Sequence, residues 1–159
     1  RPGPEKFPAL VDLDLCFPAT SASNVILGAD ALIAADIQRS HWDLHEFNSL
    51  PVDHFFDMVD FMVYFTAPTW AESFGRVLAE AIAAGKVVIS DKGTAAMLPD
   101  AIVPAVPADV DRIIAHFVAH PDQYQAHVHK AQKMLMKFSP SAFRAMFAAK
   151  LESLPGVRT

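Results

Sequence analysis

The chain has 159 residues, 52% of them apolar, and a formal net charge of −5 at pH 7. This size and apolar content suit one folded domain with its own core, and they exclude a disordered chain. The acidic balance argues against general nucleic-acid binding, which requires a basic face. Charged residues interrupt the longest apolar runs well short of the roughly 20 residues that cross a bilayer, so we expect no membrane span.

The first residues and the single cysteine bear on the chain's origin and compartment. The chain opens with RPGPEKFPAL, which contains neither an initiating Met nor a basic and apolar leader. We interpret this start as a fragment boundary without a signal peptide. Cys16 is the only cysteine and cannot form an internal disulfide, and its apolar neighbours favour a buried thiol. A reducing, cytoplasmic compartment fits these features.

Strand-like and helix-like patterns alternate along the chain as far as residue 90. In chain order, the predicted elements are a strand within 8–23, a strand at 24–28, a helix at 30–36, a strand at 42–47, a helix at 51–57, a strand at 61–65 that is central and covered on both faces, a helix at 73–84 and a strand at 86–90. Such alternation is typical of a parallel α/β sheet with crossover helices. The segment 8–23 fits a strand or a helix, and we favour the strand.

After the sequence AAMLPDAIV, the pattern predicts helices alone. These are a helix over 110–118, a helix from Pro121 to about Phe138, and a last helix over about 140–151 that begins with Ser139 as N-cap and Pro140 in the first turn. Phe143, Met146 and Phe147 share one face of the last helix, and a bulky apolar face of this kind recruits another surface. We expect either a homodimer through this helix or a helix folded back on its own domain, with the homodimer favoured.

Two carboxylates, Glu72 and Glu80, flank the start of the helix predicted at 73–84. The carboxyl ends of neighbouring strands lie beside them, where open α/β sheets bind ligands. Unpaired amides at a helix start suit a diphosphate, and Gly75 lets a ligand approach the main chain. A carboxylate can also accept hydrogen bonds from two neighbouring sugar hydroxyls. The alternative is structural: Glu72 is favourable charge at a helix N-terminus, and Arg76 with Glu80 is an exposed i,i+4 ion pair.

The stretch ESFGRVLAEAIAAGKVVIS, residues 72–90, resembles the donor-site signature of the group 1 glycosyltransferases, which are retaining enzymes of the GT-B fold. The resemblance implies a Rossmann-like parallel sheet with flanking helices, with residues 1–159 forming the single donor-binding, C-terminal half of a GT-B enzyme. It implies metal-independent transfer from a nucleotide-diphosphate sugar, which is a donor substrate, and no cofactor. An N-terminal acceptor domain is then the missing partner, and we expect this chain alone to be inactive.

The position of each residue in that signature implies its role. Glu72 would be the catalytic residue that contacts the donor sugar, and Glu80 would bind the ribose. The diphosphate would be bound near the helix start by Ser73, Phe74, Gly75 and Arg76. Lys6 resembles the family's phosphate-neutralising lysine. Arg1 lies five residues before it, a tolerable spacing for the family's arginine. The sequence DKGTAAMLPD departs from the family, which commonly has two glycines and an acid after this strand.

Other candidate sites have weaker support in the sequence. Asp12 and Asp14 match the Asp-x-Asp form that holds a divalent ion, but no nucleotide-binding unit precedes them, and we interpret them as solvated surface. His116 and His120 lie one helical turn apart without a third metal ligand nearby, which predicts a surface pair and no metal site. No nucleophile elbow or dinucleotide fingerprint is present. A sugar-nucleotide epimerase of the same fold and a non-catalytic α/β interaction domain remain alternatives.

Overall fold

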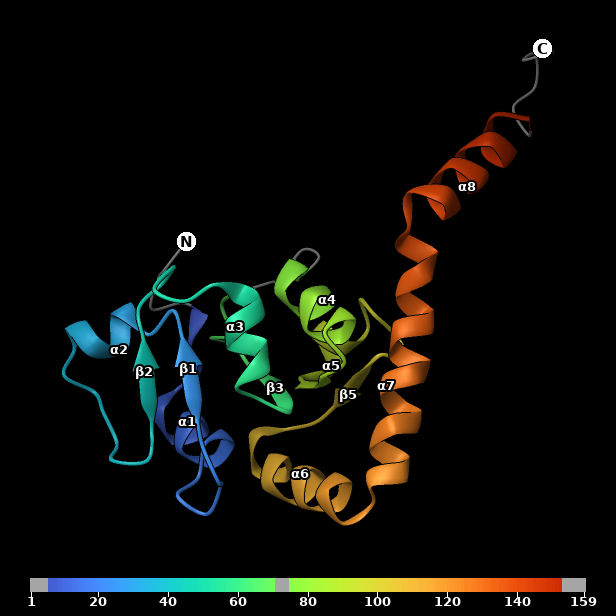
Figure 1. Cartoon of the computed structure of the whole chain (residues 1–159). Helices are drawn as coiled ribbons and strands as arrows, with labels where there is room; N and C mark the ends of the chain where they lie inside the picture. Colours follow the sequence, from blue (N-terminus) through green and yellow to red (C-terminus); the bar gives the residue numbers. More distant parts are fainter. Residues whose placement is uncertain (1–5, 71–74, 153–159) are drawn as a thin grey trace.

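The computed structural model describes residues 6–70 and 75–152 and has an α/β fold with parallel strands (Figure 1). In chain order, the elements are α1 (Leu10–Cys16), β1 (Val25–Leu27), α2 (Asp30–Ala34), β2 (Asp43–His45), α3 (Val52–Asp57), β3 (Phe61–Tyr64), α4 (Arg76–Ala83), β4 (Val87–Ser90), α5 (Lys92–Ala95), β5 (Ile102–Pro104), the 3-10 helix η2 (Pro107–Asp109), α6 (Val110–Ala119), α7 (Pro121–Leu135), the 3-10 helix η3 (Met136–Phe138) and α8 (Pro140–Glu152). The α/β class and the types of the elements predicted between residues 24 and 65 are confirmed.

The strands form two small parallel sheets where the sequence predicted one. β1 pairs with β2, and β4 lies between β3 and β5. Within the described residues, no strand pairing joins the two sheets. β3 is therefore an edge strand of its sheet, and its four residues are only partly buried. The prediction of a central strand at 61–65 was wrong, because an apolar run does not report which neighbour a strand pairs with.

β4 is the central strand of the larger sheet, and the side chains of all its residues, Val87–Ser90, are fully buried. Val88 packs with Leu78 and Ile82 of α4 on one face. Val87 and Ile89 pack on the other face in a cluster to which α6 and α7 contribute. A parallel strand covered by helices on both faces has apolar residues at successive positions. This explains the sequence VVI at residues 87–89.

The segment around Asp12 is helical, so the preference for a strand within 8–23 was wrong. In α1 the side chains of Leu13 and Cys16 are buried, at 3% and 2% exposure, whereas Val11 and Leu15 are exposed at 65% and 43%. An alternating strand would bury Val11 and Leu15 together with Leu13. The buried side chains are instead three residues apart, a spacing typical of a helix with one face on the core.

The strand β5 was not predicted, because it begins at the end of the stretch AAMLPDAIV, to which no element was assigned. This strand has three residues and pairs with β4, and the amide of Ala105 continues the contact by donating to Ser90 O at 2.8 Å. Pro104 ends it on the edge of the sheet, where the missing N–H of a proline is tolerated. Three residues that end in a proline are too few to show a strand periodicity, so no pattern in the sequence indicated this strand.

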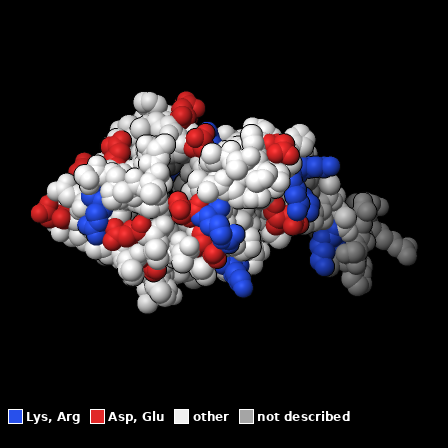
Figure 2. All heavy atoms as spheres, turned by 90° about the horizontal axis from the view of Figure 1, so that it is seen from below, with Lys and Arg blue, Asp and Glu red and all other residues white. Residues whose placement is uncertain are grey.

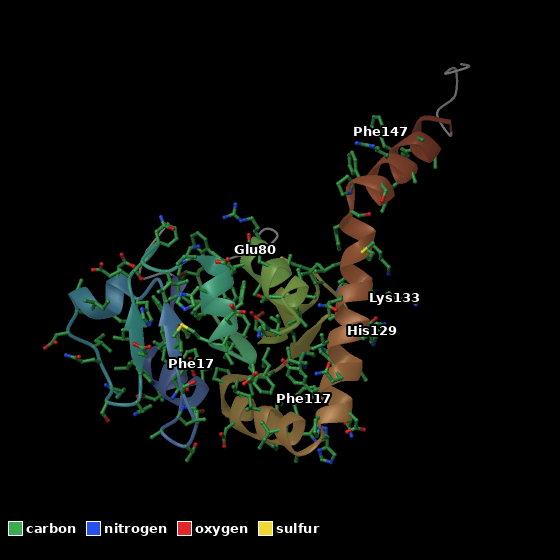
Figure 3. The ribbon with its side chains drawn as sticks, viewed as in Figure 1. Phe17, Glu80, Phe117, His129, Lys133 and Phe147 are labelled. Atoms are coloured by element: carbon green, nitrogen blue, oxygen red, sulfur yellow. The ribbon has the colours of Figure 1, made fainter. Side chains whose placement is uncertain are left out.

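The helix α7 packs against the body of the molecule through the buried side chains of Val128, Ala131 and Met134, whereas α8 extends away from it (Figure 1). The predicted helix from Pro121 ends at Leu135 and is followed by η3, and Ser139 Oγ accepts a hydrogen bond from Ala142 N at 3.2 Å at the start of α8. Phe147 lies far from Phe17 and Phe117 of the body (Figure 3). Its apolar face is therefore not folded back on the described part of the chain. No helix formed by the described residues has the length and apolarity to cross a membrane.

Asp91 caps α5, and its contribution to stability should depend on pH. Burial raises the pKa of its carboxyl, but hydrogen bonds from Thr94 Oγ1, Thr94 N and Gly93 N outweigh burial and lower the pKa below its usual value. A lowered pKa in the folded state means that the stabilisation is present above the unfolded-state pKa, about 3.9. It is lost as the pH falls through the folded-state pKa.

We therefore expect Asp91→Ala to lower the free energy of unfolding by about 1 kcal/mol at pH 7. Urea denaturation of both proteins at a series of pH values would measure this difference, which should shrink as the pH is taken below about 3.9. Asp91→Asn keeps a capping oxygen and serves as the matched control, with a smaller and less pH-dependent loss. A loss in Asp91→Ala that stayed constant with pH would contradict a role for the ionised cap.

Candidate functional site

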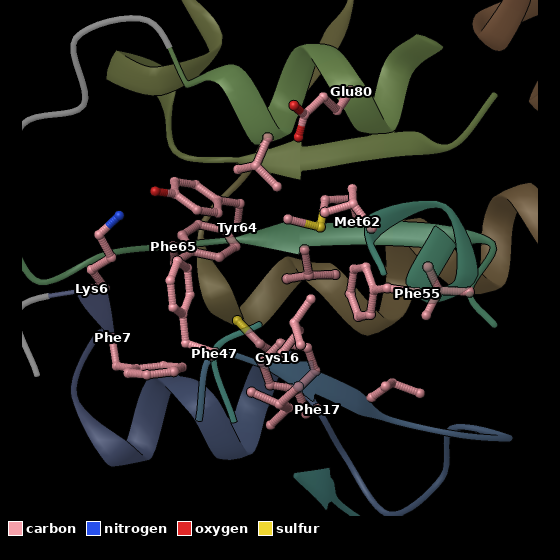
Figure 4. Close-up of a pocket in the computed structure, with 18 of the residues that line it drawn as sticks. Lys6, Phe7, Cys16, Phe17, Phe47, Phe55, Met62, Tyr64, Phe65 and Glu80 are labelled. Atoms are coloured by element: carbon pink, nitrogen blue, oxygen red, sulfur yellow. The ribbon is translucent and has the colours of Figure 1, made fainter. Parts of the chain in front are cut away.

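A cavity of about 450 Å³ lies between β1 and β3, at the place where the two sheets do not pair (Figure 4). Residues that follow the strands contribute to its wall: Gly28 after β1, Phe47 beyond β2 and Phe65 after β3. These positions are the carboxyl ends of parallel strands, where open α/β sheets bind ligands. The volume also lies within the roughly 300–1,000 Å³ that is typical of small-molecule pockets.

Lys6, Gly75, Arg76 and Glu80 all contribute to the wall of this cavity. We call these four residues the polar end of the cavity. Lys6 precedes α1, whereas the other three lie at or within the first turns of α4, so the fold joins parts of the chain that are far apart in sequence. The other three predicted site residues, Glu72, Ser73 and Phe74, lie outside the described residues, as does Arg1.

The start of α4 leaves main-chain amides without a helical partner. Gly75 adopts the left-handed conformation, with φ 65° and ψ 58°, which favours glycine. The first hydrogen bonds of the helix run to Gly75 O from Leu78 N at 2.8 Å and Ala79 N at 3.3 Å. The amides of Arg76 and Val77 precede these bonds. Amides at this position are suited to hold an anion.

The polar end contains an ion pair that also fits the structural interpretation of Glu80. Arg76 Nε lies 3.3 Å from Glu80 Oε1, and the two side chains are 88% and 39% exposed. An exposed i,i+4 pair of this kind stabilises a helix by only a few tenths of a kcal/mol. A ligand that supplied better partners to both groups could therefore displace it at little cost.

Lys6 is held by an aromatic side chain that sequence reasoning missed. Its Nζ lies 5.3 Å from the centroid of the Trp70 ring, which is the geometry of a cation–π contact. Lys6 forms no ion pair with a carboxylate of the described residues. The only signal available beforehand was a tryptophan placed between the strand at 61–65 and the motif at 72–90. Proximity to Lys6 could not be read from that placement.

Cys16 lies in the wall of the same cavity and is buried, as the sequence predicted. Burial, together with the negative charge of Asp12, raises the pKa of its thiol to about 12. The thiol is therefore protonated at neutral pH and behaves as a small apolar group in the wall.

A second hollow, of about 540 Å³, adjoins the cavity and shares Pro8 and Phe65 with it. Asp12, Trp70 and Asp91 contribute to its wall, together with threonine hydroxyls. Asp12 was expected on the solvated surface of a strand. It instead lies on α1 and lines this hollow.

The Asp-x-Asp pair does not act as a unit, because α1 is a helix. Side chains that are two residues apart on a helix point to different sides of it. Asp14 accepts two hydrogen bonds from the Arg39 guanidinium, at 2.9 and 3.0 Å. His116 and His120 are exposed, with stacked rings 4.4 Å apart, which confirms a surface pair. No group of three or more potential metal ligands is found in the part of the chain that the structure describes.

Charge on the surface is mixed. Figure 2 shows Lys and Arg side chains interspersed with Asp and Glu on one face of the molecule, without a single basic stripe. A nucleic-acid backbone would require such a stripe. This face therefore offers only local positive charge.

Comparison with known proteins does not identify this chain. No protein-family model matches it, and no curated protein matches it in sequence. The likeness of residues 72–90 to the group 1 glycosyltransferases thus rests on the motif itself.

Proposed function

We propose that this chain is the donor-binding domain of a retaining glycosyltransferase and binds a nucleoside-diphosphate sugar at the polar end of the cavity. The observation that carries the proposal is that Lys6, Gly75, Arg76 and Glu80 line one cavity at the carboxyl ends of parallel strands. All four were singled out from the sequence as donor contacts. Their convergence is not required by the α/β fold, because Lys6 belongs to a separate part of the chain.

Each group at the polar end matches one part of such a donor. The amides of Arg76 and Val77 and the Lys6 ammonium would hold the diphosphate. The Glu80 carboxylate would accept hydrogen bonds from the ribose hydroxyls. Glu72, outside the described residues, would orient the sugar.

In the reaction, the bond from the anomeric carbon to the diphosphate oxygen breaks, and a bond from that carbon to an acceptor oxygen forms. Negative charge increases on the departing diphosphate oxygen as its bond breaks, and this oxygen accepts the proton that the acceptor hydroxyl loses. Donors that are already oriented toward this oxygen stabilise that charge in the transition state. Lys6 and the start of α4 would supply this stabilisation without a metal ion.

The proposal includes a separate acceptor-binding domain of the GT-B type. Transfer requires that water be excluded and that both substrates be aligned, which together account for several kcal/mol of the barrier. A donor domain alone supplies neither in full. We therefore propose that the 159-residue chain binds donor but transfers no sugar at a useful rate on its own.

The second candidate is a non-catalytic α/β interaction domain, and the ion pair between Arg76 and Glu80 favours it. In that case Glu80 is a structural partner of Arg76, and the cavity needs no nucleotide. A sugar-nucleotide epimerase of the same fold would share the nucleotide site with the transferase. A measurement of nucleotide binding therefore distinguishes the interaction-domain hypothesis from both enzyme hypotheses.

The Glu80→Ala variant distinguishes a ribose contact from a structural ion pair when two ligands are compared. Loss of two hydrogen bonds, each contributing about 0.5–1.5 kcal/mol, should weaken binding of UDP, GDP or ADP about 5-fold or more. Inorganic diphosphate has no ribose, and the variant frees Arg76, so its affinity should stay equal or increase. Isothermal titration calorimetry of both ligands measures the contrast.

Asp111→Ala is a matched control, because Asp111 is exposed on α6 and does not line the cavity. It removes the same charge and should leave both affinities unchanged. If Glu80→Ala strengthened nucleotide and diphosphate binding alike, Glu80 would be only the partner of Arg76. If no nucleotide bound to the unaltered chain, the interaction domain would be favoured.

The proposal also includes a homodimer formed through α8. Phe143, Met146 and Phe147 are 59%, 64% and 54% exposed, and the two phenyl rings stack with centroids 6.1 Å apart. Burying one such side chain contributes roughly 1.5–3 kcal/mol. A second copy would present the same face, as a two-fold symmetric interface requires.

We expect sedimentation velocity to show dimers whose fraction rises with concentration, and Phe143→Glu combined with Phe147→Glu to abolish them. Ala145→Glu combined with Ala148→Glu is the control, because it adds the same charge to the opposite side of α8 and should leave the dimer intact. Circular dichroism would check that each variant is folded. A monomer at all concentrations, or equal disruption by both double variants, would contradict this interface.

A further inference from the structure

We propose that the second hollow, lined by Trp70, Asp12 and Asp91, binds a pyranose ring of a saccharide acceptor. This inference rests on the proposed function, in which a separate domain binds most of the acceptor. The hollow would hold only the acceptor ring nearest the donor, because a transfer reaction needs its second substrate beside the first. Binding of a saccharide to the hollow can be tested without any nucleotide.

The hollow has the side-chain chemistry that sugars require. The partly buried Trp70 contributes a large aromatic ring to its wall, and the C–H groups on one face of a pyranose pack against such a ring while its hydroxyls point outward. Met97 and Phe65 add apolar surface. Thr66 adds a hydroxyl group that can donate or accept hydrogen bonds, whereas the Thr94 hydroxyl already donates to Asp91.

Two carboxylates of the wall differ in how they are held. Asp91 is fixed by hydrogen bonds from Gly93 N, Thr94 N and Thr94 Oγ1, at 2.8, 3.0 and 2.7 Å. Asp12 is partly buried, and its carboxylate forms no hydrogen bond or ion pair with another described residue. An ionised carboxylate can accept hydrogen bonds from two adjacent hydroxyls, and a sugar would supply those donors to Asp12.

The position of the hollow suits the second substrate of a transfer reaction. It shares Pro8 and Phe65 with the cavity whose polar end is proposed for the donor, but it contains none of Lys6, Arg76 and Glu80. Trp70 also connects the two sites, since the Lys6 ammonium lies 5.3 Å from its ring. Two adjoining sites with separate polar groups would place two substrates next to one another.

The test uses the whole chain and four probes: maltohexaose, cellohexaose, chitohexaose and mannohexaose. We expect at least one to bind in the absence of nucleotide, as measured by calorimetry and by a change in tryptophan fluorescence. The chain has two tryptophans, and Trp42 is only 7% exposed, so Trp70 should report binding. Trp70→Ala should weaken that binding roughly 5-fold or more, and Trp70→Phe, which keeps an aromatic face, should weaken it less.

Asp12→Ala should weaken saccharide binding several-fold, whereas the matched control Asp111→Ala should leave it unchanged. Glu80→Ala should also leave it unchanged, so a failed donor site and a failed saccharide site give different results. The proposal would be overturned if none of the four probes bound. It would also be overturned if Trp70→Ala and Asp12→Ala, both folded, left binding intact, or if a sugar were bound only when attached to a nucleotide.

Discussion

Complete burial of β4 is the constraint on which the rest of this arrangement depends. All four of its residues are fully buried, and Ser90 satisfies its hydroxyl by donating to Tyr64 O of the neighbouring strand. A parallel strand with two buried faces must be covered by helices on both. The helix α4 covers one face of β4, and a cluster to which α6 and α7 contribute covers the other. Since α4 leads into β4, its first turn comes to lie at the carboxyl ends of the strands.

Local pattern was enough to predict α4 and the strands β1 and β3, which contribute to this site. The stripe of Leu78, Ala81 and Ile82 has the period of a helix, and all three side chains are fully buried on the core side of α4. Glu80 lies on the same helix outside that stripe, so its place near the cavity followed from the helix alone. That Lys6 would line the same site as this helix start was suggested by the family resemblance, and periodicity carries no information on it.

The features that the sequence did not reveal depend on contacts between distant segments. The burial of Leu13 and Cys16 shows that the segment of α1 is a helix, whereas its sequence alone fits both a strand and a helix. The division into two sheets depends on which strands pair, and that property has no local signature. Trp70 was overlooked for the same reason, since only the fold brings it to Lys6.

We propose that the start of α4 and Lys6 bind a nucleoside diphosphate. Amide chemical shifts from ¹H–¹⁵N spectra, recorded while UDP, GDP and ADP are added in turn, would detect this binding residue by residue. We expect saturable shifts for at least one nucleotide, concentrated at Lys6, Gly75, Arg76 and Val77, with α6 and α7 unaffected. Spectra unchanged at these four amides with all three nucleotides, or shifts spread evenly over the surface, would contradict this proposal.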